Sequence, residues 1–252
     1  MTRETKSVQR LFVDQPLSAD KTLTLTGNPA HYLRNVLRVG VDDGVLIFNG
    51  HDGEWQAKIT ALDKRTVTLV TAHQTRPQTT PETRQADIWL LVAPVKRARV
   101  DYLAQKATEM GVTRLALVIT QRTQGGTVNL DRLRANAQEA AEQCGILQVP
   151  DIMAPTRLDD AMQDWDCART LLFCDETAEA GIGVSELAAK LRQPLAVLIG
   201  PEGGFTSQER ERLLALNQTV RISLGPRILR SDTAVVAALT LVQWLAGDWQ
   251  GG

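Results

Sequence analysis

The feature that most constrains the fold is a regular alternation of short apolar runs and amphipathic segments after residue 86. Apolar runs of strand length lie at 87–95, 114–120, 170–176, 194–200 and 219–224. Segments with helical spacing follow them, at 99–111, 130–145, 184–191, 206–216 and 232–247. Strands that alternate with helices are typical of a parallel sheet with helices on its faces. The sequence therefore predicts an α/β domain with a mostly parallel sheet.

Residues from about 8 to 72 carry a different pattern, in which strand-like runs are separated by Gly and Asp turns. These runs lie at 10–13, 22–27, 44–50, 54–59 and 66–72. The exception is "AHYLRNVLRVG", where Tyr32, Leu33, Val36 and Leu37 fall at helical spacing. This part is predicted to be β-rich with one short amphipathic helix.

The segment 73–85, "HQTRPQTTPETRQ", has two prolines and no aliphatic residue. Such a composition is typical of an exposed connection between domains. We therefore expect a first domain at 1–74 and a second at 84–252.

Composition and charge exclude several classes of protein. The formal net charge of −1 means that nucleic-acid binding would depend on a local basic face. No apolar stretch reaches the roughly 20 residues that cross a bilayer, and the polar start does not resemble a signal peptide. We expect a cytoplasmic protein that does not bind membranes. The three cysteines lack a CxxC pairing, and His31, His51 and His73 lack metal-ligand spacing, so we expect no metal.

Two loops follow predicted strands and precede predicted helices. The first, "LIGPEGGFT" at 198–206, holds three glycines, and Thr206 and Glu209 have the spacing of a capping box. The second, "GPRILR" at 225–230, precedes an apolar helix that we expect to be capped by Ser231 and buried nearly all round. Ligands bind beyond the carboxyl ends of parallel strands, where glycines let the backbone approach closely. The loops are either two walls of one pocket or simply tight turns.

Neither loop carries a P-loop motif or a dinucleotide-binding motif in a suitable context, which disfavours nucleotide triphosphates and dinucleotides. A ligand with an adenine edge and an amino-acid end, bound through main-chain groups, suits these loops better.

Six segments together resemble a known family. They are "RLFV", "HYLRNVLR", "QKATEMGV", "EAAEQCG", "LIGPEGGFTSQE" and "LGPRILRSDTA". In this order they resemble the bacterial 16S ribosomal RNA uridine N3-methyltransferases of the SPOUT superfamily. The resemblance implies a PUA-like β-barrel that binds RNA, followed by an α/β methyltransferase domain with a trefoil knot. It also implies a homodimer that transfers a methyl group from S-adenosylmethionine to N3 of one uridine of the small ribosomal subunit.

The resemblance implies that main-chain groups hold the cofactor while apolar side chains shield its adenine. The residues expected to bind the cofactor are Phe173, Leu198, Ile199, Gly200, Pro201, Glu202, Gly203, Gly204, Leu224, Gly225, Ile228 and Leu229.

Uracil N3 carries a proton at neutral pH, so the reaction needs a proton acceptor or a charge that stabilises the uracil anion. Arg227 and Arg230 are candidates for stabilising that anion or gripping phosphates. Asp232 could accept the proton, or its only role could be to stabilise its helix electrostatically. Glu202 likewise has two possible roles, in the architecture of the loop or in catalysis. We expect Cys144 to be a small buried residue rather than a nucleophile. The candidate RNA contacts are Arg10, His31, Arg34, Arg38, Lys96, Arg97 and Arg99.

The sequence departs from the family pattern in reading "QRT" at 121–123 for "ERC" and "CGIL" at 144–147 for "CGR". Many relatives also carry Glu where this chain has the shorter carboxylate of Asp232. Two other functions stay open. A knotted ribose 2′-O-methyltransferase would carry an "SLNVS"-like stretch where this chain has "LRSDTA". A non-catalytic assembly factor would keep the fold without binding the cofactor.

Overall fold

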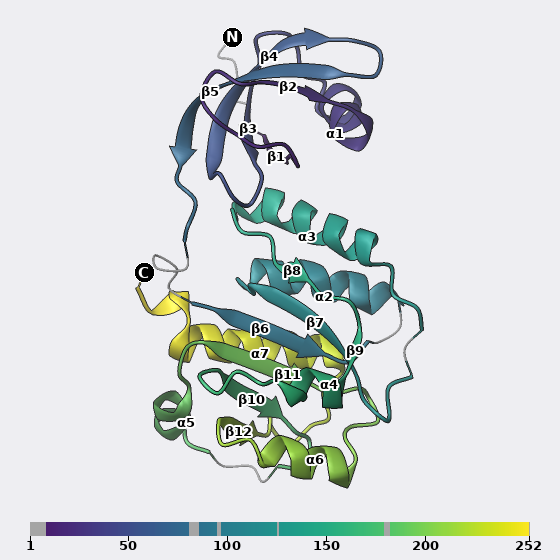
Figure 1. Ribbon diagram of the computed structural model, residues 1–252, viewed down its shortest axis with the longest axis vertical. Helices are drawn as coiled ribbons and strands as arrows, with labels where there is room; N and C mark the ends of the chain where they lie inside the picture. The colour runs from purple at the N-terminus through teal and green to yellow at the C-terminus, as the bar shows by residue number, and fades with distance from the viewer. Residues whose placement is uncertain (1–8, 81–85, 95–96, 125, 179–181, 252) are drawn as a thin grey trace. The chain divides into compact units, whose positions relative to one another are not determined.

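The computed structural model describes residues 9–80, 86–94, 97–124, 126–178 and 182–251. The chain divides into two compact units (Figure 1). One comprises residues 1–83 with 141–148, and the other comprises residues 84–140 with 149–252.

The first unit is built on a five-stranded sheet. Its strands are β1 (Arg10–Phe12), β2 (Thr22–Leu25), β3 (Gly44–Phe48), β4 (Glu54–Leu62) and β5 (Val67–Arg76). They pair in the order β1-β3-β4-β5-β2, with β1 parallel to β3 and the other pairs antiparallel. In β2 the leucines are buried and the threonines exposed, as the period-2 pattern predicts.

The predicted amphipathic helix differs from the observed one. Helix α1 (Gly27–His31) passes into a π-helical turn, η1 (Tyr32–Val36), in which the amide of Leu37 donates to the carbonyl of Tyr32. This wider turn changes which side chains share a face. Leu33 is fully buried, but Val36 is 59% exposed. The apolar face predicted from the helical spacing of Tyr32, Leu33, Val36 and Leu37 therefore lacks Val36.

Strand β5 continues into the segment expected to be a connection, because polar residues anchor it to a buried carboxylate. Glu54 is 4% exposed. Its carboxylate accepts hydrogen bonds from the Arg10 Nε at 2.6 Å, the Arg76 Nη2 at 3.0 Å and the Thr75 hydroxyl at 3.0 Å. Residues 73–76 are thus part of the sheet. The polar composition of this segment did not predict a strand, because the carboxylate of Glu54 replaces water as the hydrogen-bond partner of its polar groups.

The second unit contains a sheet in which every pairing is parallel. Its strands are β6 (Ile88–Val92), β7 (Arg114–Ile119), β8 (Asp151–Ile152), β9 (Thr156–Arg157), β10 (Thr170–Cys174), β11 (Leu195–Ile199) and β12 (Thr219–Ile222). The order is β12-β10-β11-β6-β7-β8, with β9 also pairing with β7. The predicted mostly parallel sheet is confirmed, while the short strands β8 and β9 were not predicted.

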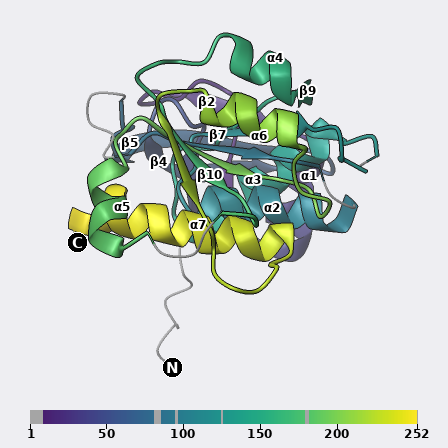
Figure 2. The same cartoon turned by 90° about the horizontal axis from the view of Figure 1, so that it is seen from below.

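Helices cover both faces of this sheet. They are α2 (Arg97–Glu109), α3 (Leu130–Cys144), α4 (Leu158–Gln163), α5 (Val184–Lys190), α6 (Ser207–Leu214) and α7 (Ser231–Ala246), and a 3₁₀ turn, η2 (Asp248–Gly251), ends the described chain. Figure 2 shows α4 and α6 on one side of the sheet and α2 and α7 on the other. Two apolar clusters correspond to these two faces. Among the described helices, none is long and apolar enough to cross a membrane.

Helix α7 departs from expectation in two ways. It was expected to be buried nearly all round, but Trp244 is 65% exposed and only one face packs into the core. Its N-cap residue is Arg230, without a capping side chain, so the prediction that Ser231 caps the helix was wrong. Ser231 is instead the first helical residue.

We predict that Glu54→Gln destabilises the protein by about 3 kcal/mol at pH 7, because it leaves buried guanidinium groups without their counter-charge. Burial by itself would raise the pKa of Glu54, but the bonds from Arg76, Arg10 and Thr75 outweigh it and hold the pKa below its ordinary value of 4.5. A carboxylate with a lowered pKa stabilises the fold above that ordinary value, and its contribution is lost as the pH falls through the folded-state pKa.

Urea denaturation followed by circular dichroism at pH 7 and near pH 3 tests this prediction. The gap between wild type and Glu54→Gln should shrink at the lower pH. Asp42→Asn, which breaks the exposed pair with Lys58, is the control and should cost less than about 1 kcal/mol. Equal effects of the two variants at pH 7 would contradict the account.

Candidate functional site

The ends of three neighbouring strands meet at one pocket of about 340 Å³. The last residue of β10 and the two that follow it contribute Cys174, Asp175 and Glu176. The last residue of β11 and the loop after it contribute the stretch 199–203, and the residues after β12 contribute 223–230. Ser231 and Ala234 of α7 complete the lining. Both glycine-bearing loops therefore line the same pocket, at the carboxyl edge of the parallel sheet.

An aromatic ring leaves no room for a side chain at the first glycine of the 198–206 loop. A Cβ atom on Gly200 would lie 2.5 Å from Cε2 of Phe205, which is closer than any real contact. Phe205 is fully buried, and its ring packs edge to face against Phe173 with centroids 5.0 Å apart. Gly204 has a φ of +67°, a conformation that a glycine adopts without strain. The glycines thus let the chain fold back over Phe205 and present peptide groups to the pocket.

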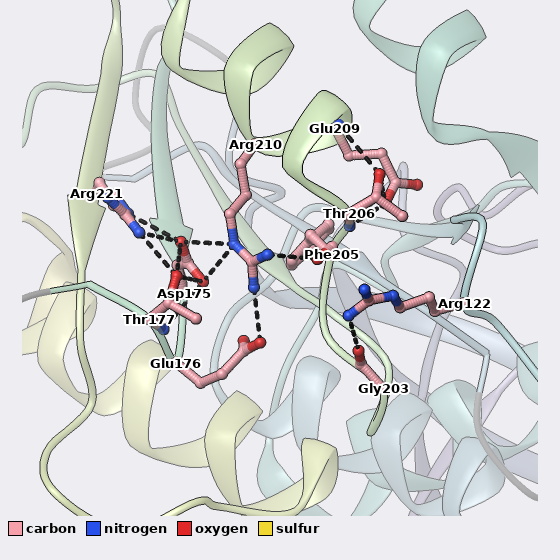
Figure 3. Close-up of polar contacts among 10 residues, drawn as sticks. All are labelled: Arg122, Asp175, Glu176, Thr177, Gly203, Phe205, Thr206, Glu209, Arg210 and Arg221. Carbon is pink, nitrogen blue, oxygen red and sulfur yellow. Dashed lines mark hydrogen bonds and ion pairs between the residues drawn. The ribbon is translucent and has the colours of Figure 1, made fainter.

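Hydrogen bonds fix the far end of this loop (Figure 3). The predicted capping box is confirmed, because Thr206 and Glu209 bond reciprocally at the start of α6. Glu209 is 3% exposed, and its carboxylate also accepts from the amide of Gln121 at 2.8 Å. Arg122 donates to the carbonyl of Gly203 at 2.9 Å. The "QRT" stretch that departs from the family pattern therefore supports the glycine loop directly.

The glycine loop is also joined to the start of α7, which directly follows the second loop. The hydroxyl of Ser231 donates to the carbonyl of Gly200 at 3.3 Å. Arg99 of α2 pairs with Glu202 at 3.0 Å, and its Nε lies 4.0 Å from a carboxylate oxygen of Asp232. Arg99 was expected to contact RNA, but its guanidinium links the glycine loop to the first turn of α7.

A buried carboxylate that the sequence analysis missed lies at the end of β10. Asp175 has a fully buried side chain and accepts from the Nε atoms of Arg210 and Arg221, at 3.1 Å and 2.8 Å (Figure 3). Burial by itself would raise the pKa of Asp175, but hydrogen bonds from Thr177, Arg221 and Arg210 outweigh it and lower the pKa. The partners lie 35 and 46 residues away, so no local spacing could have identified them.

Most of the expected cofactor residues reach the pocket. Those that line it are Ile199, Gly200, Pro201, Glu202, Gly203, Leu224, Gly225, Ile228 and Leu229. The structure does not bring Phe173, Leu198 or Gly204 to the lining. Phe173 and Leu198 are fully buried in the core beneath the loop.

The candidate catalytic residues lie on the loop after β12 and at the start of α7. Arg227 and Arg230 are exposed and line the pocket. Asp232 is partly buried and accepts from the amide of Thr233 at 2.9 Å, within the first turn of α7. The pocket wall therefore presents two cations, with a carboxylate close by.

The cysteines offer no nucleophile at the pocket. Burial raises the pKa of Cys174 to about 12, so its thiol stays protonated at neutral pH. Cys144 is exposed at the end of α3, which contradicts the expectation that it is buried. Among the described residues, no group of three or more His, Cys, Asp and Glu could hold a metal ion.

The expected RNA contacts have different environments. His31 and Arg38 are exposed. Arg34 is partly buried and donates to the carbonyl of Lys64. The side chain of Arg10 is only 12% exposed and is engaged with Glu54 and with carbonyl oxygens of residues 141, 142 and 146 of the same unit. Lys96 and the side chain of Arg97 lie outside the described residues.

Comparison with known proteins defines the class. Residues 81–243 match the model of the RNA methyltransferase domain, and residues 25–71 match that of the RNA methyltransferase PUA domain. With its parallel sheet and its pocket between strand-end loops, the chain is an RNA methyltransferase that joins a PUA-like domain to a SPOUT domain.

Individual relatives identify the family. The chain is 30% identical to the ribosomal RNA small subunit methyltransferase E of Rickettsia conorii, over 94% of this chain and 95% of that protein. It is 29% identical to the Bacillus subtilis protein of the same name, over 96% of this chain and all of that protein. The solved Neisseria gonorrhoeae ribosomal RNA small subunit methyltransferase E, bound to S-adenosyl methionine, is 27% identical, with a TM-score of 0.79 over 95% of this chain and 98% of that one. This chain belongs to the ribosomal RNA small subunit methyltransferase E family.

We predict that Gly200→Ala destabilises the protein by about 1–3 kcal/mol, because the added methyl group overlaps the Phe205 ring. Gly183→Ala is the matched control, since no atom lies within 4 Å of the added carbon, and it should change stability by less than about 1 kcal/mol. Chemical denaturation measures both. A combined Gly200→Ala and Phe205→Leu variant should lose less than the sum of its single changes, and strict additivity would contradict the assigned clash.

Proposed function

We propose that this protein transfers the methyl group of S-adenosylmethionine to N3 of one uridine in 16S ribosomal RNA. The observation that carries the proposal is the pocket that two glycine-bearing loops form at the carboxyl edge of the parallel sheet. Membership of the small subunit methyltransferase E family supports ribosomal RNA as the substrate. The bound cofactor of the Neisseria gonorrhoeae protein supports S-adenosylmethionine as the donor.

The residues present fit this cofactor. A pocket of about 340 Å³ lies within the usual range for small-molecule sites. The main chain at 199–203 and 224–229 would hold the adenine and the amino-acid end, and Ile199, Leu224 and Leu229 would cover the adenine ring. When bound, S-adenosylmethionine supplies a methyl group activated by a sulfonium. The protein's task is then to orient the cofactor and the uracil in line and to exclude water.

The acceptor nitrogen requires loss of a proton. Arg227 and Arg230 would stabilise the uracil anion or hold neighbouring phosphates. Asp232 would take the proton, directly or through water. Its position in the first turn of α7 equally suits a role in stabilising that helix.

The N3 atom lies on the Watson–Crick edge, so the uridine must be unpaired or turned out of its stack. We propose that residues 1–74 form an RNA-binding domain that presents the target to a catalytic domain at 84–252. His31 and Arg38, which are exposed, together with Arg34 are the contacts we favour there. Arg10 is largely committed to internal hydrogen bonds, so it is a weaker candidate. We propose that the protein carries out this reaction in the bacterial cytoplasm.

We propose that the protein is a homodimer whose interface uses α7. This helix exposes Trp244, and Val236 and Ala237 line a cavity together with Tyr102 of α2. Exposed apolar side chains on one helix face are typical of association surfaces. Sedimentation at micromolar concentration should give a dimer that Val236→Lys dissociates, and a monomeric wild type would contradict the proposal.

Mass spectrometry of 16S ribosomal RNA from a strain lacking this protein tests the activity. We expect one methyluridine to disappear and to return when wild type is restored. Arg227→Ala should lower kcat by about 100-fold, the effect of losing a group that stabilises developing charge. Arg192→Ala removes an exposed arginine away from the pocket and should leave kcat unchanged. An unchanged set of methyluridines in the deletion strain would contradict the substrate assignment.

A further inference from the structure

Four charged side chains form a compact group at the wall of the pocket, and we call them the charge quartet. They are the carboxylates of Asp175 and Glu176 and the guanidinium groups of Arg210 and Arg221 (Figure 3). The two positive charges balance the two negative ones. Both acidic residues line the pocket, whereas neither arginine does.

Arg210 holds the quartet to the glycine loop. Its Nε donates to Asp175 at 3.1 Å, its Nη2 donates to Glu176 at 2.8 Å, and its Nη1 donates to the carbonyl of Phe205. All three guanidinium nitrogens are therefore used, and they join the end of β10 to the end of the glycine loop. Because a guanidinium is planar and rigid, this arrangement fixes the direction of the Glu176 side chain.

Of the two acidic residues that line the pocket, Glu176 is the one with an exposed side chain. Its side chain is 42% exposed, whereas that of Asp175 is fully buried. Its Oε1 atom accepts from Arg210, and within the described part of the chain Oε2 has no hydrogen-bond donor. The same carboxylate lies over Gly204, where a Cβ atom would come within 2.1 Å of Oε1. A negative charge is thus held at the pocket wall with one oxygen left for a ligand.

We propose that the charge quartet sets the preference of this pocket for the methyl donor over the spent cofactor. Glu176 contacts the ligand, and Arg210 is its positioning residue. This inference rests on the proposed function. S-adenosylmethionine carries one more positive charge than S-adenosylhomocysteine, because methyl transfer turns the sulfonium into a neutral thioether. The charge of the wall beside the ligand therefore acts on the sulfonium but not on the thioether. The negative charge of Glu176, the exposed carboxylate of the quartet, favours the donor, and the positive charge of Arg210 limits how strong that preference is.

Two substitutions should move this preference in opposite directions. Glu176→Gln leaves the quartet with an excess positive charge, so it should weaken binding of S-adenosylmethionine more than that of S-adenosylhomocysteine. Arg210→Met leaves an excess negative charge, so it should favour the sulfonium even though the loosened loop weakens both ligands. Each variant should shift the ratio of the two Kd values by about fivefold, as expected for a unit charge at intermediate distance in a partly solvated site. A purely structural role would weaken both ligands alike and leave the ratio unchanged.

Isothermal titration calorimetry of the full-length protein with each ligand measures the ratio. The controls are Glu211→Gln and Arg212→Met on α6, which make the same charge changes at exposed positions outside the pocket lining. Opposite shifts for Glu176→Gln and Arg210→Met, with no shift for the controls, would support the proposal. An unchanged ratio, or equal shifts in the controls, would overturn it while the proposed function stands. If Arg210→Met fails to fold, the sign of the Glu176→Gln shift decides. Failure of the wild type to bind either ligand would overturn the proposed function as well.

Discussion

The contact between the ring of Phe205 and the backbone of Gly200 is the constraint on which the pocket depends. The ring inserts into the core beneath the sheet edge and packs against Phe173. The chain between residues 200 and 205 must therefore turn back sharply over the end of β11, and only a residue without a Cβ atom fits at its start. The apolar core thereby shapes the loop before any ligand arrives, which is the preorganisation that a binding site built from peptide groups needs.

Polar contacts from four other segments hold the same loop in place. The 120–123 segment reaches it through Arg122, helix α2 through Arg99 and helix α7 through Ser231. Arg210 of α6 bonds both to the loop and to Asp175 and Glu176, and so joins the end of β10 to it. Each contact is modest because it replaces a bond to water. Together they hold the glycine loop against the loop after β12, so the candidate cofactor site and the candidate catalytic arginines share one framework.

The sequence predicted those parts of the fold that depend on local pattern. The parallel sheet follows from apolar runs that alternate with amphipathic segments, and the capping box follows from the spacing of Thr206 and Glu209. Local pattern failed where a distant partner decides the outcome. The polar residues 73–76 join a strand because Glu54 is buried beneath them, and Val36 turns outward because one π-helical turn changes the helical period.

The same limit applies to the site. The glycines predicted a loop whose backbone approaches its neighbours too closely for side chains. Most of the residues named from the resemblance line the pocket. Phe173 and Leu198 were named with them, although both point into the core, because the sequence does not say which side chains at a strand end turn toward the ligand. The charge quartet was missed altogether. Its members come from the end of β10, from α6 and from β12, and only the folded chain brings them together.

A crystal structure of the protein with S-adenosylmethionine tests the central claim most directly. We expect the cofactor between residues 199–203 and 224–230, held mainly by main-chain amides and carbonyls, with its sulfonium on the side of Arg227 and Arg230. A cofactor bound at another part of the sheet would contradict the account, as would a pocket that stays filled by the protein's own side chains at saturating cofactor.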